Sequence, residues 1–206
     1  MKFSKIATIC AAVLILGAAP GFAQDAGAPG RGAGSGAAPG GGRGPAGPGL
    51  ALTTMAFADG GEIPAKYTMA VPNPVSPDLE WSNVPANTVS FVLVLHDAEM
   101  ALQKKSDDLV HWLVFNIPGS VHELPEGSGT GAALPDGALQ GKNQRGAASY
   151  MGPGAPAAGP FHHYTFDLYA LDTKLDLGAD ATRADVVKAM DGHILGKAVL
   201  VGRFHR

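Results

Sequence analysis

The amino-acid sequence predicts a single, mainly β domain over residues 50–206, preceded by a signal sequence and a linker. Three observations favour this class. Apolar runs of strand length recur along the domain and are rich in Val and aromatic residues. Only one segment combines helical spacing with signals for both helix ends. Hydrophobic residues make up 46% of the chain and charged residues 16%, which excludes a wholly disordered chain.

The first residues have the pattern of a secretory signal peptide. Lys2 and Lys5 form a basic start, an uncharged apolar run extends over residues 6–19, and small residues occupy the positions before a cleavage site at Ala23. The run is shorter than the roughly 18–20 residues that span a membrane. We therefore expect cleavage after Ala23, a mature chain without a transmembrane segment, and a periplasmic or extracellular protein. Cys10 lies inside the run, so the mature chain has no cysteine.

Residues 24–49 are expected to be a disordered linker. They contain 11 Gly, 6 Ala and 4 Pro, a composition that cannot bury apolar side chains. The domain that follows carries 17 Asp and Glu against 11 Lys and Arg. This balance argues against a nucleic-acid partner, because such partners require a basic surface.

The strands are predicted from runs of apolar and β-branched residues. The run at residues 89–95 is almost entirely apolar, as is typical of a strand buried on both faces. The run at residues 163–171 instead alternates and contains several aromatic residues. Strong strands are expected at residues 89–95, 109–117, 163–171 and 198–204, and weaker ones at 52–57 and 79–81.

One helix is expected between Thr182 and Gly192. Thr182 can act as the N-cap, Asp185 stands where the second residue of a capping box lies, and Gly192 stands just beyond the expected C-terminus. Helical spacing predicts that four apolar residues pack on the sheet from one face: Val186, Val187, Met190 and Ile194.

A long connection over residues 118–160 is the feature most suggestive of a binding site. It contains 10 Gly and 6 Pro, and loops of this length inside a compact domain are usually functional or disordered. We expect short ordered pieces within it. Because it leads directly into an aromatic strand, it is predicted to form the wall of a site.

Histidine and tyrosine side chains flank this connection. His111 lies inside a predicted strand, where a single histidine is more often a core residue than a ligand-binding one. His162 and Tyr164 strengthen the case for a site, because alternate strand residues share a face while His163 points to the other face. His162 and Tyr164 are suited to hydrogen-bond an oxyanion, whereas adjacent histidines on a regular strand are not expected to ligate one metal ion.

The segment just before His162 can supply further donors. Gly152 and Gly154 allow close backbone approach and can direct amide N–H groups toward a small anion. Pro153 and Pro156 stiffen the same segment, which keeps such donors in place before a ligand binds. Asp97, which follows a buried strand, adds a carboxylate that can orient an imidazole.

Several of these motifs resemble the phosphatidylethanolamine-binding protein family, whose bacterial members are called Raf-kinase-inhibitor-like proteins. The resemblance covers essentially all of residues 50–206 in one order. It rests on His111-Trp112, Tyr150-x-Gly152-Pro153-x-x-Pro156, His162-x-Tyr164, the segment from Leu79 to Pro85, Gly141-x-Asn143, Tyr169-Ala170-Leu171-Asp172 and Gly192-His193-Ile194-Leu195.

The resemblance implies a Greek-key β-sandwich of two packed sheets with small peripheral helices. It also implies a pocket that accepts phosphate-like anions. The residues carried over to this pocket are His111, Gly152, Gly154, His162 and Tyr164, with Asp97, Tyr150 and Asn143 in support. For Asn143, holding the loop through side-chain to backbone hydrogen bonds and contacting the ligand remain equal alternatives.

The sequence departs from the family at one place. The family's usual Asp-Pro-Asp-Ala-Pro run reads Leu95-His96-Asp97-Ala98-Glu99, so Leu95 replaces an aspartate that faces the pocket in the family. Loss of a pocket carboxylate should favour a more anionic ligand.

The leading functional hypothesis is a non-catalytic binding protein for a small anionic ligand or head group, without cofactor or metal. One alternative is a module that inhibits or binds an envelope or extracellular protein. The other is a weak metal- or histidine-dependent hydrolase, although the sequence has no Gly-x-Ser-x-Gly, His-Glu-x-x-His or Walker motif. Stoichiometric zinc bound through His111 and His162 would favour the hydrolase.

Overall fold

The structure, a computed structural model, describes residues 48–100, 107–131 and 133–206. The predicted signal peptide and almost all of the predicted linker lie outside these residues. In chain order the elements are β1 (Ala51–Thr53), β2 (Gly61–Glu62), the 3-10 turn η1 (Ala65–Tyr67), β3 (Leu79–Ser82), β4 (Ser90–Asp97), β5 (Leu109–Pro118), β6 (Glu123–Leu124), β7 (Leu139–Gln140), β8 (His162–Leu171), α1 (Arg183–Met190) and β9 (Ile194–Phe204).

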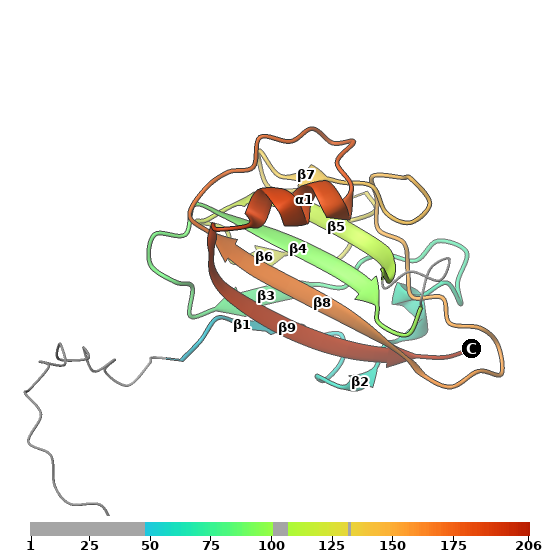
Figure 1. Ribbon diagram of the computed structural model, residues 1–206. Helices are drawn as coiled ribbons and strands as arrows, with labels where there is room; N and C mark the ends of the chain where they lie inside the picture. The colour runs from blue at the N-terminus through green and yellow to red at the C-terminus, as the bar shows by residue number, and fades with distance from the viewer. Residues whose placement is uncertain (1–47, 101–106, 132) are drawn as a thin grey trace, which may run out of the picture. The chain divides into compact units, whose positions relative to one another are not determined.

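The strands form two sheets, which confirms the mainly β fold class. The smaller sheet has the order β1-β3-β6, and the larger has the order β2-β9-β8-β4-β5-β7. Between β5 and β8 the chain adds β6 to the smaller sheet and β7 to the edge of the larger sheet beside β5, and it then returns as β8 on the opposite side of β4 (Figure 1). This return is the long connection of a Greek-key arrangement. The connection carries β6 and β7, so the expected ordered pieces are present.

Two apolar clusters cover the two faces of the larger sheet. The main core lies between the sheets and includes Leu52 and Trp81 from the smaller sheet with Leu95 and Phe166 from the larger. The second cluster lies on the other face, beneath α1. β4 is buried along its whole length because alternate residues enter the two clusters, as the apolar run at residues 89–95 predicted.

A change of register in β5 determines where His111 points. Leu95 of β4 pairs with Trp112, but the next residue, His96, pairs with Val110, so His111 is an extra residue in the ladder. Such a bulge lets adjacent side chains turn to one face, and bulges are common beside functional sites. Trp112 belongs to the main core, and Val110 belongs to the second cluster.

The capping of α1 is as predicted, but its apolar face is narrower. Thr182 and Asp185 form the reciprocal capping box, and Val186 and Met190 are buried. The expectation that Val187 and Ile194 share the buried face is wrong. Val187 remains 47% exposed, and Ile194 is already the exposed first residue of β9. The chain turns at Gly192, whose φ of 83° is in the left-handed region, so helical spacing does not extend to Ile194.

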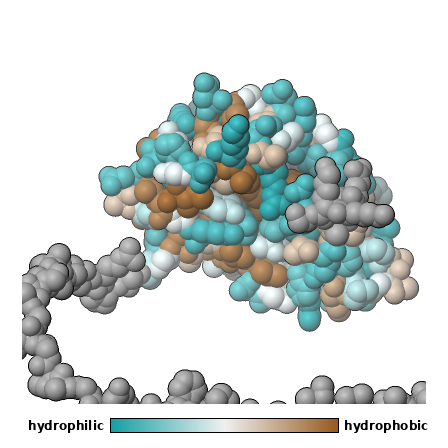
Figure 2. Space-filling model, viewed as in Figure 1, coloured by the Kyte–Doolittle hydropathy of each residue, from teal (hydrophilic) through white to brown (hydrophobic). Residues whose placement is uncertain are grey.

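The surface over α1 and the larger sheet is mixed in polarity. Figure 2 shows hydrophobic residues interspersed with hydrophilic ones on this face. Among the residues that the structure describes, no helix is long and apolar enough to cross a membrane.

Candidate functional site

The predicted site residues meet at one end of the larger sheet. Asp97 ends β4, His111 stands near the start of β5, and His162 and Tyr164 begin β8. Asp97 lies directly opposite Tyr164 in the β4–β8 register. The ring of His111 packs edge-on against the ring of Tyr164, with centroids 5.1 Å apart. Strand pairing therefore brings together side chains that are up to 67 positions apart in the sequence.

His111 is held by the connection that precedes β8. Its Nδ1 lies 2.9 Å from the Met151 carbonyl oxygen and 3.1 Å from that of Gly152. The side chain is almost wholly buried, and burial lowers the pKa of His111. The two carbonyls and the Asp97 carboxylate act in the opposite direction but more weakly. The ring is therefore held in its neutral form, with the Nδ1 proton directed at the carbonyls.

His162 is oriented by Asp97, as the sequence predicted for this carboxylate. His162 Nδ1 lies 2.8 Å from Asp97 Oδ2, and both residues are buried. The second Asp97 oxygen, Oδ1, accepts a hydrogen bond of 3.1 Å from the Glu99 amide. Because the carboxylate holds Nδ1, Nε2 is the ring nitrogen of His162 that is left for other partners.

The hydroxyl of Tyr164 is linked to the glycine segment. The Gly154 amide donates to this hydroxyl oxygen at 3.1 Å. Burial raises the pKa of Tyr164, and the nearby Asp97 carboxylate raises it further. The group is therefore a neutral hydroxyl that lies beside the Asp97 carboxylate.

Gly152 and Gly154 allow a close approach, but it is another segment of the protein that approaches them. A Cβ at Gly152 would lie 2.9 Å from the Tyr67 carbonyl oxygen, and one at Gly154 would lie 2.5 Å from Met69 Sδ. The Met69 amide also donates to the Pro153 carbonyl at 2.8 Å. The Gly154 amide is already engaged by Tyr164, so of the two amides proposed for the anion only that of Gly152 lacks a partner among the described residues.

Asn143 and Tyr150 have structural positions. Asn143 Oδ1 accepts from the amides of Arg145 and Ala147, and its Nδ2 donates to the Ser149 carbonyl. The loop-holding alternative for Asn143 is therefore the one that its contacts support. The buried Tyr150 hydroxyl donates to the Tyr67 carbonyl at 2.7 Å.

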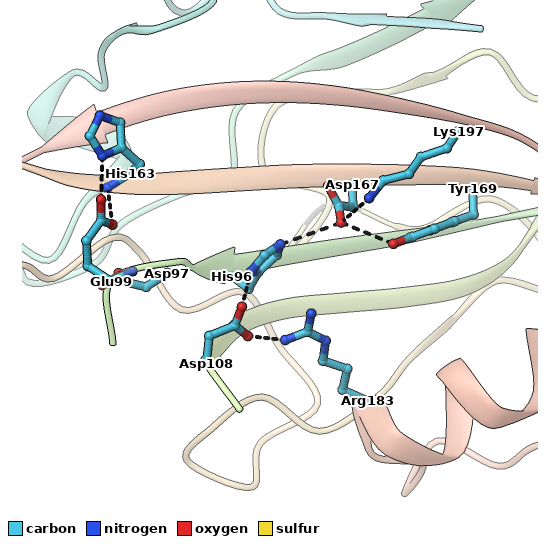
Figure 3. A network of polar contacts seen from close by, with 9 residues as sticks. All are labelled: His96, Asp97, Glu99, Asp108, His163, Asp167, Tyr169, Arg183 and Lys197. Carbon is cyan, nitrogen blue, oxygen red and sulfur yellow. Dashed lines mark hydrogen bonds and ion pairs between the residues drawn. The ribbon is translucent and has the colours of Figure 1, made fainter. Parts of the chain in front are cut away.

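Sequence reasoning missed two residues near the site. Glu99 pairs with the exposed His163, with Oε1 2.5 Å from Nδ1 and Oε2 accepting from the His163 amide (Figure 3). The positive charge of Arg145 acts on His111 and contributes to its lowered pKa. The alternation of two carboxylates in Asp97-x-Glu99 opposite two adjacent histidines was the available signal for the Glu99–His163 pair.

His96 points away from this site, into a polar network on the other face of β4 (Figure 3). Its Nδ1 lies 2.5 Å from Asp108 Oδ2, and its Nε2 lies 3.6 Å from Asp167 Oδ2. Asp108 is also paired with Arg183 of α1, while Asp167 accepts from Lys197 at 2.8 Å. The network joins β4, β8, β9 and α1 at the level of the site.

One group among the described residues has the composition of a metal site. Single ligand atoms of Asp97, Glu99 and His162 lie within 4.8 Å of one another. His111 is not part of this group, so the pairing of His111 with His162 around zinc is not the arrangement seen. The two carboxylates are also already bonded to His162 and His163.

An open hollow of about 550 Å³ lies elsewhere, beside β3 and β6. None of the predicted site residues lines it. Its walls are formed by Glu80, Trp81, Ser120, Val121, His122 and Glu123.

Comparison with known proteins places this arrangement in a family. The model of the phosphatidylethanolamine-binding protein family matches residues 53–205, essentially the whole described domain. The chain belongs to the phosphatidylethanolamine-binding protein family. A UPF0098 protein of Methanothermobacter thermautotrophicus is 43% identical over 155 residues, which cover 75% of this chain and 98% of that protein.

Solved structures of other family members share the fold. A putative phosphatidylethanolamine-binding protein homologue from Chlamydia trachomatis superposes with a TM-score of 0.68 at 34% identity, covering 77% of this chain and 98% of that one. YbcL of Escherichia coli, described as a member of the mammalian family, gives 0.69 at 28% identity over 76% of this chain and 98% of YbcL. The chain thus lies in the branch of this family that contains bacterial and archaeal proteins.

Within the phosphatidylethanolamine-binding protein family, this chain has an apolar residue at one expected pocket position. Leu95 is fully buried in the main core and pairs with Trp112. The carboxylate near the site is therefore Asp97, which His162 engages.

Proposed function

We propose that this protein is an exported, non-catalytic binding protein that holds a phosphate-like anionic group of a small ligand. His111, His162, Tyr164 and the segment at residues 150–154 form the pocket. The observation that carries the proposal is shared by both histidines. A protein oxygen holds Nδ1 of each ring. Among the described residues, Nε2 of each ring has no hydrogen-bond partner and is not sealed from solvent. Oriented polar atoms that lack protein partners are what a binding site offers to a ligand.

The charges around the pocket suit a small anionic group. The Tyr164 hydroxyl is neutral and its oxygen accepts from Gly154, so its proton can be donated either to the Asp97 carboxylate beside it or to a ligand oxygen. Asp97 holds Nδ1 of His162, so Nε2 is the ring nitrogen that can face the ligand. Arg145 adds a positive charge near His111. Leu95 stands where the family usually has a pocket aspartate, so one carboxylate that would repel an anion is missing.

The non-catalytic assignment rests on the state of these groups. The raised pKa of Tyr164 disfavours the phenolate that nucleophilic catalysis would need. The alternative of metal-dependent hydrolysis is favoured by one observation, the close grouping of Asp97, Glu99 and His162. Metal analysis of the purified protein, with a phosphatase and esterase screen, separates the two functions: stoichiometric metal with turnover would refute the binding protein.

The binding proposal is tested by titrating methyl phosphate into wild-type protein and the variant His162→Gln at pH 6. Loss of one hydrogen bond to a charged group costs roughly 1.5–3 kcal/mol, so we expect affinity to fall by about ten- to a hundredfold. His122→Gln is the matched control, because His122 is exposed and lies outside the pocket. Absence of binding to the wild type, or equal affinities of the wild type and His162→Gln, would contradict the proposal.

A further inference from the structure

We infer that the ligand must bring a proton of its own, so that the pocket selects a singly protonated oxyanion, such as a phosphate monoester monoanion, over an oxyanion of the same charge without a proton. This inference rests on the proposed function and specifies the chemistry of its ligand. It is carried by the hydrogen bonds of His111, which leave an acceptor and not a donor facing the ligand.

The tautomer of His111 follows from its partners. Both partners of Nδ1 are carbonyl oxygens, at 2.9 and 3.1 Å, and a carbonyl oxygen can only accept. The ring proton is therefore on Nδ1. In the neutral ring Nε2 carries a lone pair, and among the described residues the hydrogen bonds of the His111 ring are both made by Nδ1.

The surroundings of His111 keep the ring neutral. Burial is the largest influence and lowers the pKa of His111, and the positive charge of Arg145 acts in the same direction. Asp97 from β4 opposes this change, and Tyr164 from β8 packs against the ring as a neutral hydroxyl. His162 joins the group through its bond to Asp97. A ligand oxygen thus meets a lone pair at His111.

A ligand without a proton would leave this acceptor unpaired. An oxyanion oxygen placed against Nε2 would bring two acceptors together in a buried place, which is costly because neither is then hydrogen-bonded. A P–OH group instead donates to Nε2, so the acceptor at His111 is satisfied. The geometry of His111 therefore favours a ligand that carries a hydroxyl proton.

Methyl phosphate and methyl sulfate test this inference directly. Near pH 6, the second pKa of a phosphate monoester, about half of methyl phosphate is the monoanion with one P–OH. Methyl sulfate has the charge of this monoanion and nearly the same shape, but it has no proton. We expect methyl phosphate to bind at least tenfold more tightly in calorimetric or NMR titrations.

His111→Asn is the variant that tests the role of His111. The asparagine amide can replace the Nδ1 donor to the loop carbonyls but offers nothing in place of Nε2. We expect the preference for methyl phosphate to fall to threefold or less, with the thermal unfolding temperature measured as a check on folding. His162→Gln is expected to weaken both ligands and to keep the preference.

The outcomes separate the two proposals. Equal binding of methyl phosphate and methyl sulfate to the wild type would overturn the inference and leave the proposed anion binding intact. An unchanged preference in a folded His111→Asn would also overturn it. Absence of binding by either ligand would refute the proposed function and the inference together.

Discussion

The buried carboxylate of Asp167 offers a quantitative test of the network beside the site. Its side chain is only 8% exposed and accepts from Lys197 at 2.8 Å (Figure 3). Burial raises the pKa of Asp167, but His96 and Lys197 more than offset this effect and bring the pKa from its ordinary 3.8 to about 2. A carboxyl whose pKa falls on folding stabilises the folded state wherever it is ionised in both states.

The size of this contribution follows from the shift. The pKa of Asp167 falls from 3.8 to about 2 on folding, and each pKa unit corresponds to about 1.4 kcal/mol. Ionised Asp167 therefore contributes about 2 kcal/mol to the free energy of unfolding. The contribution is fully present above pH 5 and is progressively lost as the pH falls from about 4 through 2. At pH 3 roughly half of it remains.

The assay is urea unfolding of wild-type protein and of Asp167→Asn at pH 6 and pH 3. We expect the variant to be less stable by about 2 kcal/mol or more at pH 6, and the difference to narrow by about 1 kcal/mol at pH 3. Asp172→Asn is the matched control, because Asp172 is an exposed carboxylate paired with His193. It should change stability by no more than about 0.5 kcal/mol. A difference between wild type and Asp167→Asn that does not depend on pH would refute the reasoning.

Two further predictions concern the glycine segment and the N-terminus. Gly152→Ala places a Cβ 2.9 Å from the Tyr67 carbonyl oxygen and 3.0 Å from Pro74. We therefore expect a lower thermal unfolding temperature and weaker methyl phosphate binding. Gly131→Ala is the control and should behave as wild type, because its Cβ meets no atom within 4 Å. If the first residues are a signal peptide, mass spectrometry of the protein isolated from the periplasm or medium should show a chain that begins at Gln24, whereas a full-length chain retained in the cell would contradict the expectation.

The parts of the site that sequence could predict depend on local periodicity. His162 and Tyr164 are buried while His163 is exposed, as alternation along a strand requires. The capping box of Thr182 and Asp185 was equally predictable, because both of its hydrogen bonds form within four residues of chain. The buried character of β4 followed from an unbroken apolar run.

The bulge at His111 was not predictable in this way. A regular strand would have placed His111 and Trp112 on opposite faces, yet the register of β5 against β4 places an extra residue at His111. The partners of Glu99 and His96 were missed for a related reason. Glu99 pairs with His163 across 64 positions, and His96 contacts Asp167 from a different strand.

The sequence by itself determined where the four longest strands lie, where the helix begins, and which chemical groups are available for the proposed anion site. These properties depend on side-chain periodicity and on hydrogen bonds between near neighbours. Only the tertiary structure decided that His111 presents an unpaired Nε2, that Gly154 is bound to Tyr164, and that Asp97 orients His162. Each of these depends on contacts between segments that meet only when the sheet forms, because register and burial set both the direction of a side chain and its protonation.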